Sequence, residues 1–146
     1  MSVRRYGLRA GAAAAAAIVL VLLAACGGDG KPATKAEWER RHGATVRNVN
    51  AALAQVQAAT HDGEPVAIRT NCEALRDTLR EARATLPVPD KAADTALRKA
   101  LDGMDAGVGD CLRAMAAGDA RQLERSISEL HDARVQLDSA NAALAR

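Results

Sequence analysis

The chain has 146 residues, a length typical of one domain. Its hydrophobic fraction of 49% is rich in alanine, while phenylalanine is absent and tryptophan and tyrosine occur once each, so the composition excludes a sheet protein and favours helices. Residues 1–25 contain three of the 20 basic residues and none of the acidic ones, so residues 26–146 carry 17 basic and 18 acidic residues. This later part of the chain therefore lacks the positive net charge that a nucleic-acid partner requires.

The first 25 residues have a basic start and an uncharged core. Arg4, Arg5 and Arg9 precede or border a run of sixteen uncharged residues at positions 10 to 25, which is shorter than the about 20 residues of a membrane-spanning helix. This pattern is typical of a secretory signal peptide. The paired arginines also agree with twin-arginine export, and the sequence leaves that route and the general secretory route open.

Residues 23 to 26, Leu-Ala-Ala-Cys, resemble the lipobox of bacterial lipoproteins. The resemblance implies that the sulfur of Cys26 receives a diacylglyceryl group and that a signal peptidase cuts between Ala25 and Cys26. The alternative is an ordinary signal peptide or membrane anchor with a chance cysteine. Residues 26 to 33 then form the lipidated cysteine and a flexible, glycine-rich tether. We expect the mature protein on the outer face of the cell membrane, with the lipid bilayer as its partner through Cys26.

The first two amphipathic helices are predicted after the tether. Thr34 and Glu37 form a capping box, and apolar residues then recur at steps of four and three until HDGEP at 61–65 breaks the pattern. The second helix ends before LPVPD at 86–90, because a residue that precedes proline disfavours helical geometry. Its start is open between Pro65 and a second capping box formed by Thr70 and Glu73.

The third and fourth helices begin at the predicted N-caps Asp90 and Asp119, and Gly118 ends the third. Four amphipathic helices with short connections predict an all-α, up-down-up-down antiparallel bundle over residues 34–146. The alternative is a three-helix core with a mobile first helix. The third helix contains glycines at 103, 107 and 109. They have three interpretations, which are close helix packing, a local irregularity and a ligand-binding kink.

Two cysteines remain once Cys26 is assigned to lipid. Cys72 and Cys111 fall on the apolar stripes of the second and third helices, and the extended PVPD segment compensates for an offset of about 10 Å between their levels. We predict a disulfide between them, with two buried free thiols as the alternative. Residues 71–115 are similar to small actinobacterial envelope lipoproteins that carry a cysteine pair around a proline–aspartate turn, which implies a helical envelope domain and no activity.

No catalytic motif occurs in the sequence, and we expect no enzyme activity, no metal and no cofactor. His42 is expected to be partly buried and hydrogen-bonded rather than a ligand of metal or haem. A solvated face is the expected role of three aspartates at helical spacing, Asp102, Asp105 and Asp110. Trp38 is expected to close the core near the tether, and the alternative is a contact with a protein partner. The arginines around it carry a charge suited to anionic lipid headgroups.

These features predict a membrane-anchored extracytoplasmic lipoprotein that acts as a protein-interaction or envelope-accessory module. The alternative function is a carrier of a small molecule or cofactor. Its pocket would lie inside the bundle near residues 103–109 and would be lined by Met104 and Met115.

Overall fold

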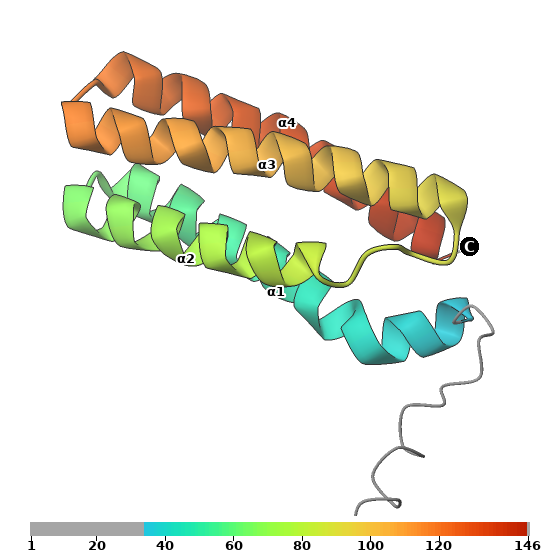
Figure 1. Cartoon of the computed structure of the whole chain (residues 1–146). Coiled ribbons are helices and arrows are strands. Elements are labelled where there is room, and N and C mark those ends of the chain that lie inside the picture. The colour runs from blue at the N-terminus through green and yellow to red at the C-terminus, as the bar shows by residue number, and fades with distance from the viewer. Residues whose placement is uncertain (1–33, 146) are drawn as a thin grey trace, which may run out of the picture. The chain divides into compact units, whose positions relative to one another are not determined.

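The computed structural model describes residues 34–145, which form four α-helices. In chain order these are α1 (Lys35–Asp62), α2 (Pro65–Arg83), α3 (Lys91–Ala117) and α4 (Ala120–Leu144). Successive helices run in opposite directions (Figure 1), so the predicted all-α, up-down arrangement is confirmed. The predicted signal peptide, Cys26 and the tether lie outside the described residues.

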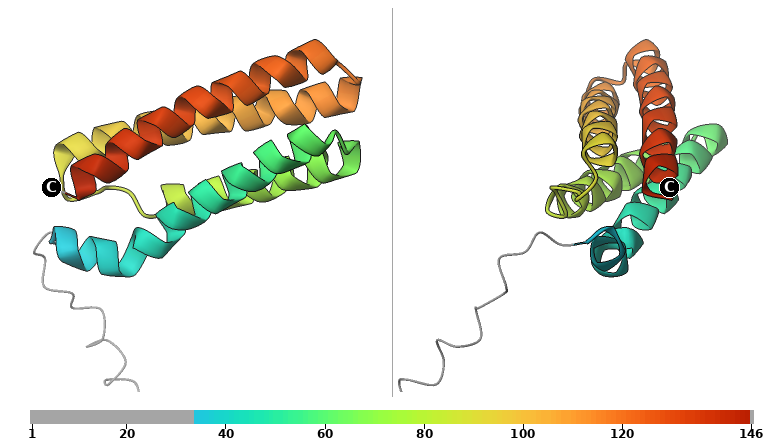
Figure 2. Two further views of the ribbon diagram at one scale, coloured as in Figure 1. Left: turned by 180° about the vertical axis from the view of Figure 1, so that it is seen from behind. Right: turned by 90° about the vertical axis from the view of Figure 1, so that its right-hand side faces the viewer.

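The helices are arranged as two hairpins, one formed by α1 and α2 and the other by α3 and α4 (Figures 1 and 2). Gly63 and Gly118 end the first helix of each hairpin with φ values of 73° and 66°. This left-handed backbone is open to glycine without a steric cost, which explains the residue type at both turns. The hairpins meet mainly through α2 and α3, whereas α1 and α4 contact each other sparsely.

Side-chain caps begin three of the helices as the sequence predicts. The Thr34 hydroxyl accepts a hydrogen bond from the Glu37 N–H at 3.3 Å, and the Glu37 carboxylate accepts one from the Thr34 N–H at 3.0 Å. Asp90 and Asp119 each accept an N–H from the first turn of α3 and α4. These bonds satisfy amides that have no partner within the helix, which places the helix starts at these residues.

The start of α2 resolves an alternative that the sequence leaves open. Pro65 occupies the first helical position, where its missing N–H costs nothing, and Glu64 precedes it without a side-chain cap. Thr70 lies inside the helix, so the second capping box is the wrong choice. Residues 84–90 then leave the helical conformation and lead to α3, as the two prolines predict.

The core joins one apolar stripe from each helix. α1 contributes buried residues along its length from Trp38 to Ala59, so the three-helix core is wrong. On α4 the burial is less complete than predicted, because Leu123 and Ile127 are half-buried while Ser126 is fully buried. The largest wholly buried side chains are Leu53, Leu75, Leu79, Leu97, Leu101, Met104, Leu130 and Leu137.

Two glycines of α3 allow α4 to approach closely. A Cβ atom at Gly107 would lie 2.8 Å from Cγ of Leu130, and one at Gly103 would lie 3.1 Å from Cβ of Ala133. A Cβ at Gly109 would meet only the guanidinium of Arg113 on the same helix. α3 is continuous through all three positions. Close packing is therefore the role of Gly103 and Gly107, and Gly109 has no such contact with α4.

We expect the substitutions Gly107→Ala and Gly109→Ala to change stability in opposite directions. Both remove a glycine from a helix interior, which favours the helix by about 1 kcal/mol. At Gly107 the new methyl group overlaps Leu130, and overpacking of this kind costs about 1–3 kcal/mol, so the net effect is destabilising. Urea denaturation of both variants checks this expectation. Equal stabilisation of the two would show that the contact with α4 does not constrain residue 107.

Candidate functional site

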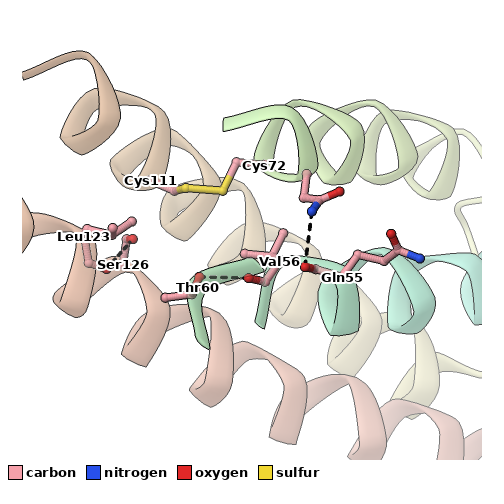
Figure 3. Close-up of a disulfide and its surroundings, with 8 residues drawn as sticks. Gln55, Val56, Thr60, Cys72, Cys111, Leu123 and Ser126 are labelled. Carbon is pink, nitrogen blue, oxygen red and sulfur yellow. Dashed lines mark hydrogen bonds between the residues drawn. A yellow bond between two sulfur atoms is a disulfide. The ribbon is translucent and has the colours of Figure 1, made fainter. Parts of the chain in front are cut away.

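The strongest chemical feature of the described residues is a disulfide between the two hairpins. Cys72 of α2 and Cys111 of α3 are joined by an S–S bond of 2.07 Å, with their Cα atoms 6.6 Å apart (Figure 3). Both residues are fully buried. The predicted pairing is therefore present, and the alternative of two free thiols is wrong. A buried disulfide is typical of proteins that fold outside the cytoplasm.

The register of the two cysteines depends on the unequal lengths of α2 and α3. Cys72 lies 11 residues before the last residue of α2, whereas Cys111 lies 20 residues after the first residue of α3. The nine-residue difference corresponds to about 13 Å of helical rise. Residues 84–90 connect the two helices, as a turn at 84–85 followed by a segment without helical structure, and cover this distance (Figure 1). The short α2 is therefore the reason that the cysteines lie at one level.

The hydroxyl groups beside the disulfide are used within their own helices. Thr60 donates to the Val56 carbonyl at 2.8 Å, and Ser126 donates to the Leu123 carbonyl at 2.7 Å (Figure 3). Such bonds satisfy polar groups at a buried position without a partner on another helix. The surroundings of the disulfide thus support a structural bridge rather than a reactive centre.

Trp38 connects the first turns of α1 to the segment that follows α2. Its side chain is 3% exposed, and its indole N–H donates to the Thr85 carbonyl at 2.8 Å. The half-buried ring of His42 lies 5.6 Å from the Trp38 ring. Trp38 therefore closes the core at this end of the bundle, as predicted. A contact between Trp38 and a protein partner would require the ring to leave this position.

Asp94 organises the connection between α2 and α3. Its carboxylate accepts hydrogen bonds from the Val88 N–H at 2.8 Å and from Nε of Arg98 at 2.7 Å. Burial alone would raise the pKa of Asp94, but these two bonds hold the pKa below its ordinary value. The charged carboxylate thus stabilises the extended segment next to Trp38. This role of Asp94 was not predicted from the sequence, although an aspartate in the first turn of a helix that follows a proline segment is a usable signal.

The aspartates on α3 are only in part the solvated face that was predicted. Arg83 at the end of α2 donates to Asp102 at 2.7 Å and to Asp105 at 2.6 Å. The bond to Asp102 is the main cause of a raised pKa of Arg83, which partial burial opposes. Asp110 pairs instead with Arg113 of its own helix, which lowers the pKa of that carboxyl. Asp102 and Asp105 therefore add an ionic contact between the hairpins.

The surface of α3 and α4 has a hollow of about 310 Å³ beside Gly103. Its floor is formed by small side chains and its rim carries charge, with the lining residues Lys99, Gly103, Ala106, Glu129, Asp132, Ala133 and Gln136. Neither methionine of the expected carrier pocket lines this hollow, because Met104 is fully buried in the core and Met115 packs against it. The hollow thus includes Gly103 and Ala106 of the range 103–109 named in the alternative prediction, but it is a surface groove and not a pocket inside the bundle lined by the two methionines.

In comparisons with known proteins, no protein-family model, curated protein or solved structure matches this chain. None of the four helices in residues 34–145 has the length and apolar character needed to cross a bilayer. Within the same residues, no three histidine, cysteine or acidic side chains gather as a metal site would require. The predicted cleavage residues Ala25 and Cys26 lie outside the described part of the chain.

We expect the double variant Cys72→Ala/Cys111→Ala to unfold at a much lower temperature than the native chain. A bond between residues 39 apart lowers the conformational entropy of the unfolded state and so adds about 4 kcal/mol to the free energy of unfolding. Its removal corresponds to a fall in melting temperature on the order of 10–20 °C in a domain of this size. Thermal unfolding followed by circular dichroism measures the difference. A reductant should lower the melting temperature of the native chain and leave that of the variant unchanged. An unaltered melting temperature in the variant would contradict the stabilising role of the bond.

We expect Asp94→Asn to reduce stability at neutral pH by about 1 kcal/mol, because an amide does not supply the charged acceptor that Arg98 uses. The folded state lowers the pKa of Asp94, so its stabilisation is complete above the ordinary carboxyl pKa near 4 and is lost as the pH falls through the folded value. Native and variant chains should therefore converge in stability below about pH 3. Asp138→Asn, on the exposed face of α4, is the control. A constant difference between native and variant from pH 7 to pH 2 would contradict the assignment.

Proposed function

We propose that the protein is an extracytoplasmic helical module, anchored to the outer face of the cell membrane by acyl chains on Cys26, that serves as a protein-interaction or envelope-accessory protein. The observation that carries this proposal is the buried disulfide between α2 and α3. Reducing systems in the cytoplasm oppose disulfide formation, so the bond favours folding after export. The basic and apolar segment at residues 1–25 supplies a matching export signal.

The cysteine inventory supports the anchoring step. Of the three cysteines, Cys72 and Cys111 pair with each other, which leaves the sulfur of Cys26 for a thioether with a diacylglyceryl group. Cys26 follows small residues in the pattern that resembles a lipobox. Two or more acyl chains hold a protein stably on a bilayer, whereas one chain gives only marginal binding. The same sulfur would therefore decide the location of the whole domain.

The shapes of the surface hollows favour contacts with another macromolecule. Two adjoining grooves of about 340 Å³ and 610 Å³ follow the seam between α1 and α2, and they share Ala51, Gln55 and Asn71 in their linings. Apart from Asp62 in the larger groove, these grooves present uncharged side chains, mostly alanine and amide groups, over an extended area rather than enclosing a ligand. On a tether, such a surface meets neighbouring proteins at a high effective concentration.

Transport of a small molecule is the second candidate function. The hollow beside Gly103 has a volume at the lower end of the range for ligand sites, and Ala106 and Ala133 give it an apolar floor. A ligand bound there would contact the charged rim at Lys99 and Asp132. A non-covalent ligand that remains with the protein during purification would support this function over the interaction module.

Mass spectrometry of the membrane-extracted protein tests the anchoring proposal. We expect a chain that begins at Cys26, carries a diacylglyceryl group and is two hydrogens lighter than its reduced form. Cys26→Ala should prevent acylation and release the protein from the membrane fraction. The matched control Cys72→Ala/Cys111→Ala retains Cys26 and should stay in the membrane fraction. Recovery of the native chain outside the membrane fraction, with Met1 present and three free thiols, would overturn the proposal.

A further inference from the structure

The charges of the described residues are divided unevenly along the helix axes. We define the anchor-side half as residues 34–48, 78–104 and 133–145, and the distal half as residues 49–77 and 105–132. The anchor-side half contains ten basic and seven acidic residues, whereas the distal half contains five basic and ten acidic residues. Their formal net charges are therefore +3 and −5. The bundle is electrically polarised from one end to the other.

The positive half is the end at which the chain enters the bundle. The start of α1, the segment 84–90 and the end of α4 lie at this end, and the turns at Gly63 and Gly118 lie at the opposite end (Figures 1 and 2). All three lysines of the described residues belong to the anchor-side half, at positions 35, 91 and 99. Basic side chains therefore cluster where the anchor is attached.

The first half of α1 contributes three of the seven exposed basic residues of the anchor-side half, and the other four are Arg80, Lys91, Arg98 and Lys99. Arg40, Arg41 and Arg47 are exposed, as is Lys91 at the start of α3. Several of the acids at this end are engaged locally: Glu37 caps α1, Asp90 caps α3, and Asp94 binds Arg98. The acids Glu39, Glu81 and Asp138 remain exposed and reduce the net charge without reversing it.

The tether limits which end can reach the membrane. Seven residues, 27–33, lie between Cys26 and Thr34, so the eight steps from Cys26 to Thr34 span at most about 29 Å when fully extended. The 27 residues of α3 alone measure about 40 Å. An acylated Cys26 therefore keeps the start of α1 within about 29 Å of the headgroups, whereas the distal turns reach the bilayer only if the bundle lies flat or tilts toward it with the tether extended.

We propose that the anchor-side half of the bundle docks on anionic lipid headgroups and that the acidic distal half is held away from the membrane. This inference rests on the proposed anchoring through Cys26. The potential of an anionic bilayer decays within a Debye length of about 8 Å at physiological ionic strength. The charges nearest the surface therefore decide the orientation, and these are the arginines of α1 together with Lys35 and Lys91. The distal turns are then the part presented to other proteins.

Chemical footprinting of the acylated full-length mature protein tests the orientation. The protein is extracted from membranes and reconstituted into vesicles of phosphatidylcholine, with or without about one-third phosphatidylglycerol. We expect amine acylation of Lys35 and Lys91 to be about threefold slower on the anionic vesicles at low salt, because the headgroups screen both amines from the reagent. Addition of 0.5 M NaCl should remove the difference. Carboxyl labelling of Asp62, Glu64 and Asp119 in the distal half should be equal on both vesicles.

Two charge-reversal variants distinguish an effect of the basic residues at the anchor-side end from an effect of the total charge of the protein. Arg40→Glu/Arg41→Glu should abolish the lysine protection, whereas Arg121→Glu/Arg125→Glu, with the same change of net charge in the distal half, should retain it. All four arginines are exposed, so both variants should keep the helical circular dichroism spectrum. Equal protection on neutral and anionic vesicles, or its loss in both variants, would overturn the docking inference. Failure of the native protein to sediment with either vesicle would instead contradict the anchoring proposal.

Discussion

The covalent bridge between Cys72 and Cys111 is the constraint on which the arrangement of the two hairpins depends. α2 and α3 form the principal seam between the hairpins, while α1 and α4 meet sparsely. The contacts across that second seam include a 3.3 Å bond from Arg134 of α4 to Gln57 of α1. The bond stabilises this arrangement chiefly because it limits separation of the hairpins in the unfolded chain, and it lies at the seam where the hairpins meet most.

The shortness of α2 explains much of the remaining structure. Because α2 ends about 13 Å before the level at which α3 begins, the non-helical residues 84–90 replace its missing turns. Such a segment leaves backbone groups unpaired that a continuous helix would satisfy. Trp38 supplies a donor to the Thr85 carbonyl, and Asp94 supplies an acceptor for the Val88 N–H. Trp38 and Asp94 thus hold the non-helical segment 84–90 against the bundle, where it takes the place of further turns of α2.

The distinctive polar and aromatic groups of the described residues are used in internal contacts. The disulfide is enclosed, the hydroxyl groups around it are bonded within their helices, and Trp38 is committed to the core. What the bundle offers to its surroundings is shape and charge: grooves along the helix seams and a polarity from a basic to an acidic end. Both properties suit a domain whose proposed role is to be held at a membrane and to meet other proteins there, since tethering converts weak surface contacts into effective ones.

The sequence by itself determined the features that depend on neighbouring residues along the chain. The capping box at Thr34, the aspartate caps, the proline break and the heptad-like stripes all act within a few residues, and the cysteine pairing followed from lengths that can be counted. Tertiary structure alone decided which faces meet: the contact of Gly107 with Leu130, the pairing of Arg83 with Asp102 and Asp105, and the burial of Ser126. These features depend on the rotation and separation of helices far apart in sequence, and helical periodicity specifies which face is apolar without specifying its neighbour.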